Sequence, residues 1–76
     1  MQMLKSAFQA VDLSSRSKRR KAVTLVVDLL ERIRMAEVAY MERIPENLHG
    51  SDAYDNADCA IGLLDEAIDS VNAVYD

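Results

Sequence analysis

The chain has very few of the residues that make turns, disulfides or aromatic clusters. Its 76 residues include two Gly, one Pro, one Cys and no Trp. The scarcity of turn formers argues against an all-β fold, in which Gly and Pro separate many short strands. With a single cysteine, Cys59, the chain cannot form an internal disulfide. It is therefore not one of the small secreted proteins that disulfides hold together. The length limits the chain to one domain, which we expect to span residues 1–76.

Long hydrophobic runs and targeting signals are also missing. No stretch approaches the roughly 20 apolar residues of a membrane span. The first ten residues lack the charged start, apolar run and cleavage site of a secretory signal peptide. We therefore expect a cytoplasmic protein with no membrane partner. Because 50% of the residues are hydrophobic, we also expect a folded chain rather than a disordered tail.

Basic residues are absent from the second half of the chain. Residues 1–43 hold all nine Lys and Arg with five acidic residues, whereas residues 44–76 hold eight acidic residues and no Lys or Arg. The net charge of -4 disfavours a general nucleic-acid coat. An asymmetry of this kind indicates a charged partner, or two halves of one chain that face each other.

The few turn residues divide the sequence into helices. Pro45 disfavours helix at the preceding residue, and Ser51 is a typical N-cap. We therefore predict long helices over residues 18–43 and 52–75, joined by a loop at 44–51. A connection this short makes the two helices antiparallel. A short amphipathic helix is predicted over residues 2–12, and one of the serines that follow it caps the long helix.

The last segment has the clearest periodicity. Its large apolar residues follow one another at alternating spacings of three and four, which is a heptad seam. A second row of small apolar residues lies beside this seam. The seam consists of Tyr54, Ala57, Ile61, Leu64, Ile68, Val71 and Tyr75, and the second row of Ala53, Ala60, Ala67 and Val74.

The middle segment is apolar over a wider arc than one partner helix can cover. One of its stripes contains Val26, Leu29, Ile33 and Tyr40, which we expect to face Ile61, Leu64, Ile68 and Val71. Since a single hairpin leaves the other apolar side in water, we predict an all-α hairpin that dimerises into a four-helix bundle. The rival arrangement is a monomer in which residues 2–12 fold back over the exposed arc. Eleven residues of helix span only about 17 Å, so the dimer is favoured.

A cluster of cations lies at the start of the middle segment. It could bind the phosphates of a nucleic acid with strong, salt-sensitive affinity, which would make the chain a small nucleic-acid-associated protein. The structural interpretation, which we favour, is that the cations compensate the acidic end of the last helix near Asp69 and Asp76. The cluster consists of Arg16, Lys18, Arg19, Arg20 and Lys21.

No constellation of residues indicates an enzyme, a metal site or a cofactor. His49 and Cys59 are the only residues of their kinds, and we expect them too far apart for a nucleophile pair. His49 with Asp52 and Asp55 lacks the fixed ligands of a zinc site. The carboxylates of the last helix fall on several faces and do not converge. Tyr40 and Tyr54 are expected to pack together at the loop end, with Leu48 as a plug.

The segment from Arg43 to Ser51, followed by Tyr54 and the acidic repeat ending at Asp69, resembles a known group of proteins. Pro-Glu-Asn-Leu, then Gly-Ser, then an acidic helix is the recurring pattern of small uncharacterised helical-hairpin proteins of gut bacteria, linked to prophages or mobile elements. The resemblance covers residues 40–70. It implies a helix-loop-helix turn and no reaction, cofactor or binding residue.

The sequence as a whole predicts a non-catalytic interaction or adaptor module in a bacterial cytoplasm. Its expected partner is a second copy of itself, with another protein as a further possibility. The nucleic-acid interpretation of residues 16–21 is the alternative.

Overall fold

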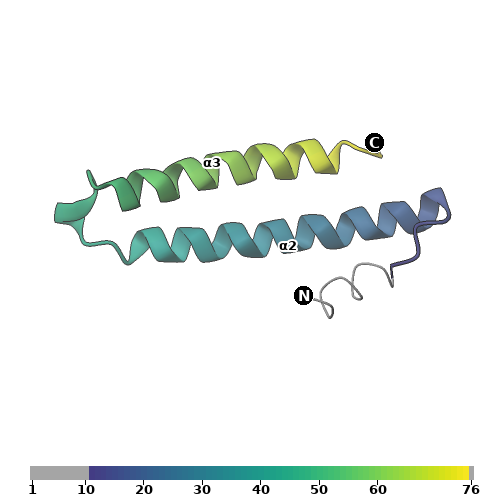
Figure 1. The fold of residues 1–76 in the computed structure, drawn as a ribbon, viewed down its shortest axis with the longest axis horizontal. Helices are drawn as coiled ribbons and strands as arrows, with labels where there is room; N and C mark the ends of the chain where they lie inside the picture. The colour runs from purple at the N-terminus through teal and green to yellow at the C-terminus, as the bar shows by residue number, and fades with distance from the viewer. Residues whose placement is uncertain (1–10, 76) are drawn as a thin grey trace.

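The fold is a long helical hairpin, seen in a computed structural model that describes residues 11–75 (Figure 1). Helix α2 spans Arg16–Glu42, and helix α3 spans Asp52–Asn72. A single 3-10 turn, η1, at Glu46–Leu48 lies in the connection. The two long helices pack against each other, and no strand occurs within residues 11–75. The all-α hairpin expected from the sequence is thereby confirmed.

Both helices begin at serine caps. The Ser15 hydroxyl accepts a hydrogen bond from the Lys18 backbone N–H, and the Ser51 hydroxyl accepts one from the Tyr54 backbone N–H. Each cap satisfies one of the N–H groups that the first turn of a helix leaves unpaired. Helix α2 therefore begins two residues before the predicted position, and α3 ends at Asn72 rather than at residue 75.

The predicted helix over residues 2–12 lies mostly outside the described residues. Only Val11 and Asp12 of that range are described, and neither is helical. The chain from Val11 to Ser15 is an irregular segment that leads directly into α2 (Figure 1).

The connection closes at the predicted place, but its aromatic contact is a different one. Helix α2 ends at Glu42 with Arg43 as its C-cap, as Pro45 requires. The Tyr54 ring stacks on His49, with ring centroids 4.4 Å apart. Among residues 11–75 no aromatic pair joins Tyr40 to Tyr54, and Tyr40 and Leu48 are 43% and 48% exposed, so the expected Tyr40–Tyr54 pair with a Leu48 plug is not seen. The aromatic partner of Tyr54 is instead His49, which belongs to the loop itself.

The hairpin interior uses the predicted seam of α3 and a different seam of α2. In α3 the heptad residues from Tyr54 to Val71 are partly or fully buried, with Ala57 the most buried at 1% exposure. In α2 the inner row is Val23, Val27, Leu30, Arg34, Glu37 and Met41, again at alternating spacings of four and three. We call these two sets the inner rows.

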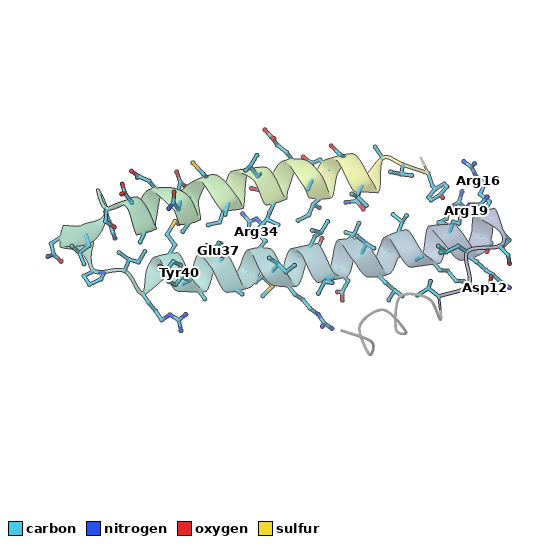
Figure 2. The ribbon with its side chains drawn as sticks, viewed as in Figure 1. Asp12, Arg16, Arg19, Arg34, Glu37 and Tyr40 are labelled. Atoms are coloured by element: carbon cyan, nitrogen blue, oxygen red, sulfur yellow. The ribbon has the colours of Figure 1, made fainter. Side chains whose placement is uncertain are left out.

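The expected pairing of the Val26 stripe with α3 is therefore wrong. Val26, Leu29, Ile33 and Tyr40 are all classed as exposed, although Ile61, Leu64, Ile68 and Val71 do lie in the hairpin interior. The inner row contains Arg34, whose guanidinium Nε lies 2.5 Å from the Asp65 carboxylate of α3. This ion pair gives the charged residue a partner at its inner position. Arg34 extends from α2 toward α3 in Figure 2.

Candidate functional site

The most distinctive surface of the molecule is an uncovered apolar row along α2. Val26 is 48% exposed, Leu29 52%, Ile33 44% and Tyr40 43%. These four side chains are regularly spaced along the helix, so they form one stripe rather than scattered exposures. Apolar area of this kind, arranged in a line, is typical of a surface that another element covers.

The same side of the hairpin carries the second row of α3. In each helix, every residue of the outer row comes one position before a residue of the inner row: Ile33 precedes Arg34, and Ala60 precedes Ile61. One residue is a rotation of about 100° about the helix axis. Because the two helices are right-handed and antiparallel, equal rotations away from the inner rows turn both outer rows to the same side. We call this side the apolar face; its apolar residues are Ala22, Val26, Leu29, Ile33, Ala36, Tyr40, Ala53, Ala60, Leu63, Ala67 and Val74, and α3 adds the polar Asn56 and Ser70.

The apolar face continues into a groove at the start of α2. The groove has a volume of about 400 Å³. Two of its lining residues, Val11 and Leu13, belong to the irregular segment before the helix, and Leu25 adds a large side chain that is 67% exposed. The sequence interpretation missed this groove because nothing in the periodicity of α2 shows where Val11 and Leu13 lie. The remaining lining residues are Ala22, Val26 and Leu29.

The opposite side of the hairpin is polar. Its positions come one residue after the inner rows, and α3 places four aspartates there. A smaller cleft of about 180 Å³ opens on this side near the chain ends, where Thr24 of α2 and Asn72 of α3 line it together. We call this side the acidic face; it includes Asp28, Glu31, Glu42, Asp55, Asp58, Asp65 and Asp69. The hairpin thus has one apolar and one acidic face.

The acidic face is a solvated surface in the described chain. Asp28 and Arg32 form an i,i+4 ion pair at 3.3 Å, with both side chains more than half exposed. Pairs of this kind contribute only about 0.3–0.5 kcal/mol. No group of three or more metal-ligating side chains is found among residues 11–75.

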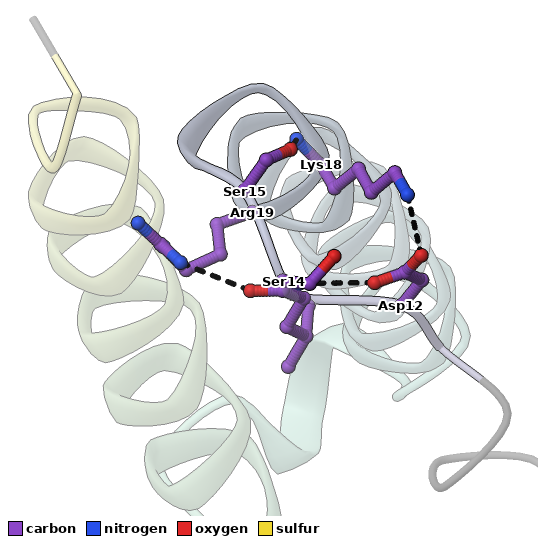
Figure 3. Close-up of polar contacts among 6 residues, drawn as sticks. Asp12, Ser14, Ser15, Lys18 and Arg19 are labelled. Carbon is purple, nitrogen blue, oxygen red and sulfur yellow. Dashed lines mark hydrogen bonds and ion pairs between the residues drawn. The ribbon is translucent and has the colours of Figure 1, made fainter.

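The basic cluster makes contacts with its own chain. The Lys18 ammonium lies 2.5 Å from the Asp12 carboxylate, and an Arg19 guanidinium N–H donates to the Leu13 carbonyl oxygen at 3.0 Å. Dashed lines mark both contacts in Figure 3. Asp12 also accepts a hydrogen bond from the Ser14 backbone N–H at 3.0 Å. These contacts fold the segment before α2 onto the first turns of the helix, and so hold Val11 and Leu13 beside the groove.

The Asp12 carboxyl titrates well below its usual range. The hydrogen bond from Lys18 is the largest cause, followed by the side-chain and backbone hydrogen bonds from Ser14, and together they lower the pKa of Asp12 from 3.8 to about 2. Asp12 therefore keeps its negative charge beside Lys18 down to acidic pH.

Two further cations of the cluster lie over an aromatic ring. The guanidinium carbon of Arg16 is 5.0 Å from the centre of the Tyr75 ring, and that of Arg20 is 6.0 Å away. Both distances suit a cation–π interaction. Among residues 11–75 no ion pair joins Arg19, Arg20 or Lys21 to Asp69, so the expected compensation by that carboxylate is not seen. Asp76 lies outside the described residues.

The remaining candidate residues do not come together. Cys59 is exposed on α3, whereas His49 is in the loop against Tyr54. Within the described part of the chain, no helix is both long and apolar enough to cross a membrane. Comparisons of the chain with protein families, with curated proteins and with solved structures find no match. The interpretation of the site therefore depends on the geometry of the apolar face.

Proposed function

We propose that the protein is a non-catalytic interaction module that associates with a second copy of itself through the apolar face, in a bacterial cytoplasm. The observation that carries this proposal is the scarcity of buried side chains in one hairpin. Within residues 11–75 only Val27 and Ala57 are classed as buried, while the outer row of α2 stays in contact with water. Two hairpins packed face to face form a four-helix bundle and cover this row.

The nucleic-acid alternative has less support. Lys18 and Arg19 are held by Asp12 and Leu13, and Arg16 and Arg20 lie over Tyr75. A phosphate would have to compete with these contacts for four of the five cations. The acidic face lies along the same hairpin and would repel a polyanion.

The proposal is tested by placing a charge on each side of α2 in turn. Ile33→Asp puts a carboxylate on the apolar face, and Met35→Asp puts one on another side of the same helix, at a residue that is 68% exposed. Fully burying an isoleucine is favourable by about 1.5–3 kcal/mol, so covering a half-exposed one contributes about 1 kcal/mol. A dimer loses this twice, and it must also desolvate two carboxylates.

We expect Ile33→Asp to weaken association at least about thirtyfold, which corresponds to about 2 kcal/mol. Met35→Asp should leave the association unchanged. Analytical ultracentrifugation over a concentration series measures both variants against the parent chain. If the two variants weaken association equally, or if neither does, the apolar face is not the interface.

A further inference from the structure

The groove at the start of α2 is lined from two sides, by the helix and by the chain that precedes it. Val11 and Leu13 line it together with Leu25 of α2, and all three side chains are exposed. Apolar side chains that gather around an open groove are typical of a site that another apolar group occupies. The described chain begins at Val11, so residues 1–10 are attached at the groove itself.

The segment before α2 turns back along the helix, from its start toward its middle. Val11 lines the same groove as Leu29, which lies more than three turns into α2. The contacts of Asp12 and Leu13 with the first turns of the helix hold the segment in this direction. Figure 1 shows the purple end of the described chain turned back toward the middle of α2. A chain that continues in this direction passes along the apolar face.

Residues 1–10 carry most of an apolar stripe that ends in the groove. Four apolar residues follow the spacing i, i+3, i+4, i+7, which places them on one side of a helix. The last of the four is Val11, which already lines the groove. The polar residues between them fall on the opposite side. The apolar stripe consists of Leu4, Ala7, Phe8 and Val11, and the polar side of Gln2, Lys5, Ser6 and Gln9.

The wall of the groove on α2 has the same spacing as this stripe. Two apolar stripes of equal spacing cover each other when their helices lie side by side. Because residues 1–10 are joined directly to Val11, their binding to the groove is intramolecular, with an effective concentration of the order of millimolar. A second copy at micromolar concentration competes poorly for the same place. The residues of this wall are Ala22, Leu25, Val26 and Leu29.

We propose that the groove is the binding site for residues 1–10 of the same chain, with Phe8 against Val26 and Leu29. Ten residues of helix span about 15 Å, against about 40 Å for the 27 residues of α2. The segment therefore covers only the groove end of the apolar face, and the loop end with Tyr40 remains for a second copy. The inference goes beyond the proposed function, because the segment binds its own hairpin in a monomer and in a dimer alike.

Tryptophan fluorescence tests the proposal in the full chain. The sequence contains no Trp, so one tryptophan placed in residues 1–10 reports on its own surroundings. Phe8→Trp puts it on the apolar stripe, and Gln9→Trp puts it on the polar side as the matched control. In the groove the indole ring is shielded from water, so we expect Phe8→Trp to emit at a shorter wavelength than Gln9→Trp and to be quenched less by acrylamide. Equal emission and equal quenching would overturn the proposal.

A second substitution shows which surface shields the tryptophan. Leu25→Asp puts a carboxylate in the groove, where covering it with apolar side chains is unfavourable. Thr24→Asp adds the same charge at the neighbouring exposed position, on the acidic face. In the Phe8→Trp chain we expect Leu25→Asp to raise emission wavelength and quenching to those of Gln9→Trp, and Thr24→Asp to change neither. An unchanged emission in the Leu25→Asp chain would overturn the proposal.

Dilution separates this binding from the association of two copies. We expect the Phe8→Trp emission to stay constant down to concentrations at which light scattering gives the 8.5 kDa of one chain. An emission that moves to longer wavelength as the dimer dissociates would mean that a second copy shields residue 8. That result would overturn the inference and leave the proposed function standing. A shielded tryptophan in a chain that is monomeric at every concentration would support the inference and overturn the proposed function.

Discussion

Replacing Gly62 with alanine should stabilise the protein, and the structure sets the size of the effect. Gly62 lies in the middle of α3, is exposed, and an added Cβ atom would meet nothing within 4 Å. It lies one position after Ile61, which turns it away from the apolar face. The substitution therefore changes no contact within the hairpin and none in the proposed dimer.

The remaining effect is helix propensity. Glycine in a helix interior is less favourable than alanine by about 0.8–1.0 kcal/mol, because the unfolded chain loses more freedom there. For a domain of this size, about 1 kcal/mol raises the melting temperature by about 4–8 °C. Gly62→Ser should fall between the parent and Gly62→Ala, because serine has intermediate propensity.

Chemical denaturation followed by far-UV circular dichroism measures the series at one fixed protein concentration, so that association contributes equally to every sample. We expect the midpoint to rise in the order Gly, Ser, Ala with an unchanged slope. A fall in the midpoint for Gly62→Ala would mean that another element approaches this side of α3, and it would refute our placement of the faces.

Three other outcomes follow from the same structure. Leu64→Asp places a carboxylate in the inner row of α3 and should unfold the chain, so a far-UV circular dichroism spectrum equal to that of the parent would contradict the seam. The pKa of Asp12 is lowered in the folded state, so its contribution to stability is complete above the unfolded pKa of about 4 and is lost as the pH falls toward 2. An NMR titration should place the Asp12 midpoint near 2, and Lys18→Met should move it upward; an unmoved midpoint would show that Lys18 is not the cause. For the basic cluster we expect no retardation of DNA or RNA in a gel at low salt, and a shift that Arg19, Arg20 and Lys21 replacements abolish would favour the nucleic-acid alternative.

The sequence predicts the hairpin well because its signals are local. Pro45 ends α2, Ser51 caps α3, and the spacing from Tyr54 to Val71 marks the inner row of α3. Each of these features acts within a few residues of itself, so that no knowledge of the partner helix is needed to interpret it.

The inner row of α2 was not predictable in the same way. Two rows with apolar residues lie side by side on this helix. Because one of them contains the charged Arg34, the sequence alone favours the other as the row that faces α3. Only the position of Asp65 on the other helix shows that Arg34 is paired. This contact joins residues that are 31 positions apart, so the periodicity within one helix does not show it.

The candidate site was partly predictable for the same reason. A wide apolar arc on the middle segment predicted that one hairpin leaves apolar surface uncovered, and this surface is present. Its residues were assigned to the interior instead, because the arc does not show which stripe faces α3. The groove depends on the contacts that Asp12 and Arg19 make with their neighbours. No pattern in the sequence predicts these contacts.

The most direct test of the account is the molar mass of the parent protein in solution, measured by light scattering over a series of dilutions. Self-association through the apolar face predicts about 17 kDa, twice the 8.5 kDa of one chain, with a decrease toward one chain on dilution. A mass of 8.5 kDa at every concentration, together with a sharp thermal transition, would contradict it. That result would mean that a single hairpin is stable with Val26, Leu29 and Ile33 in water.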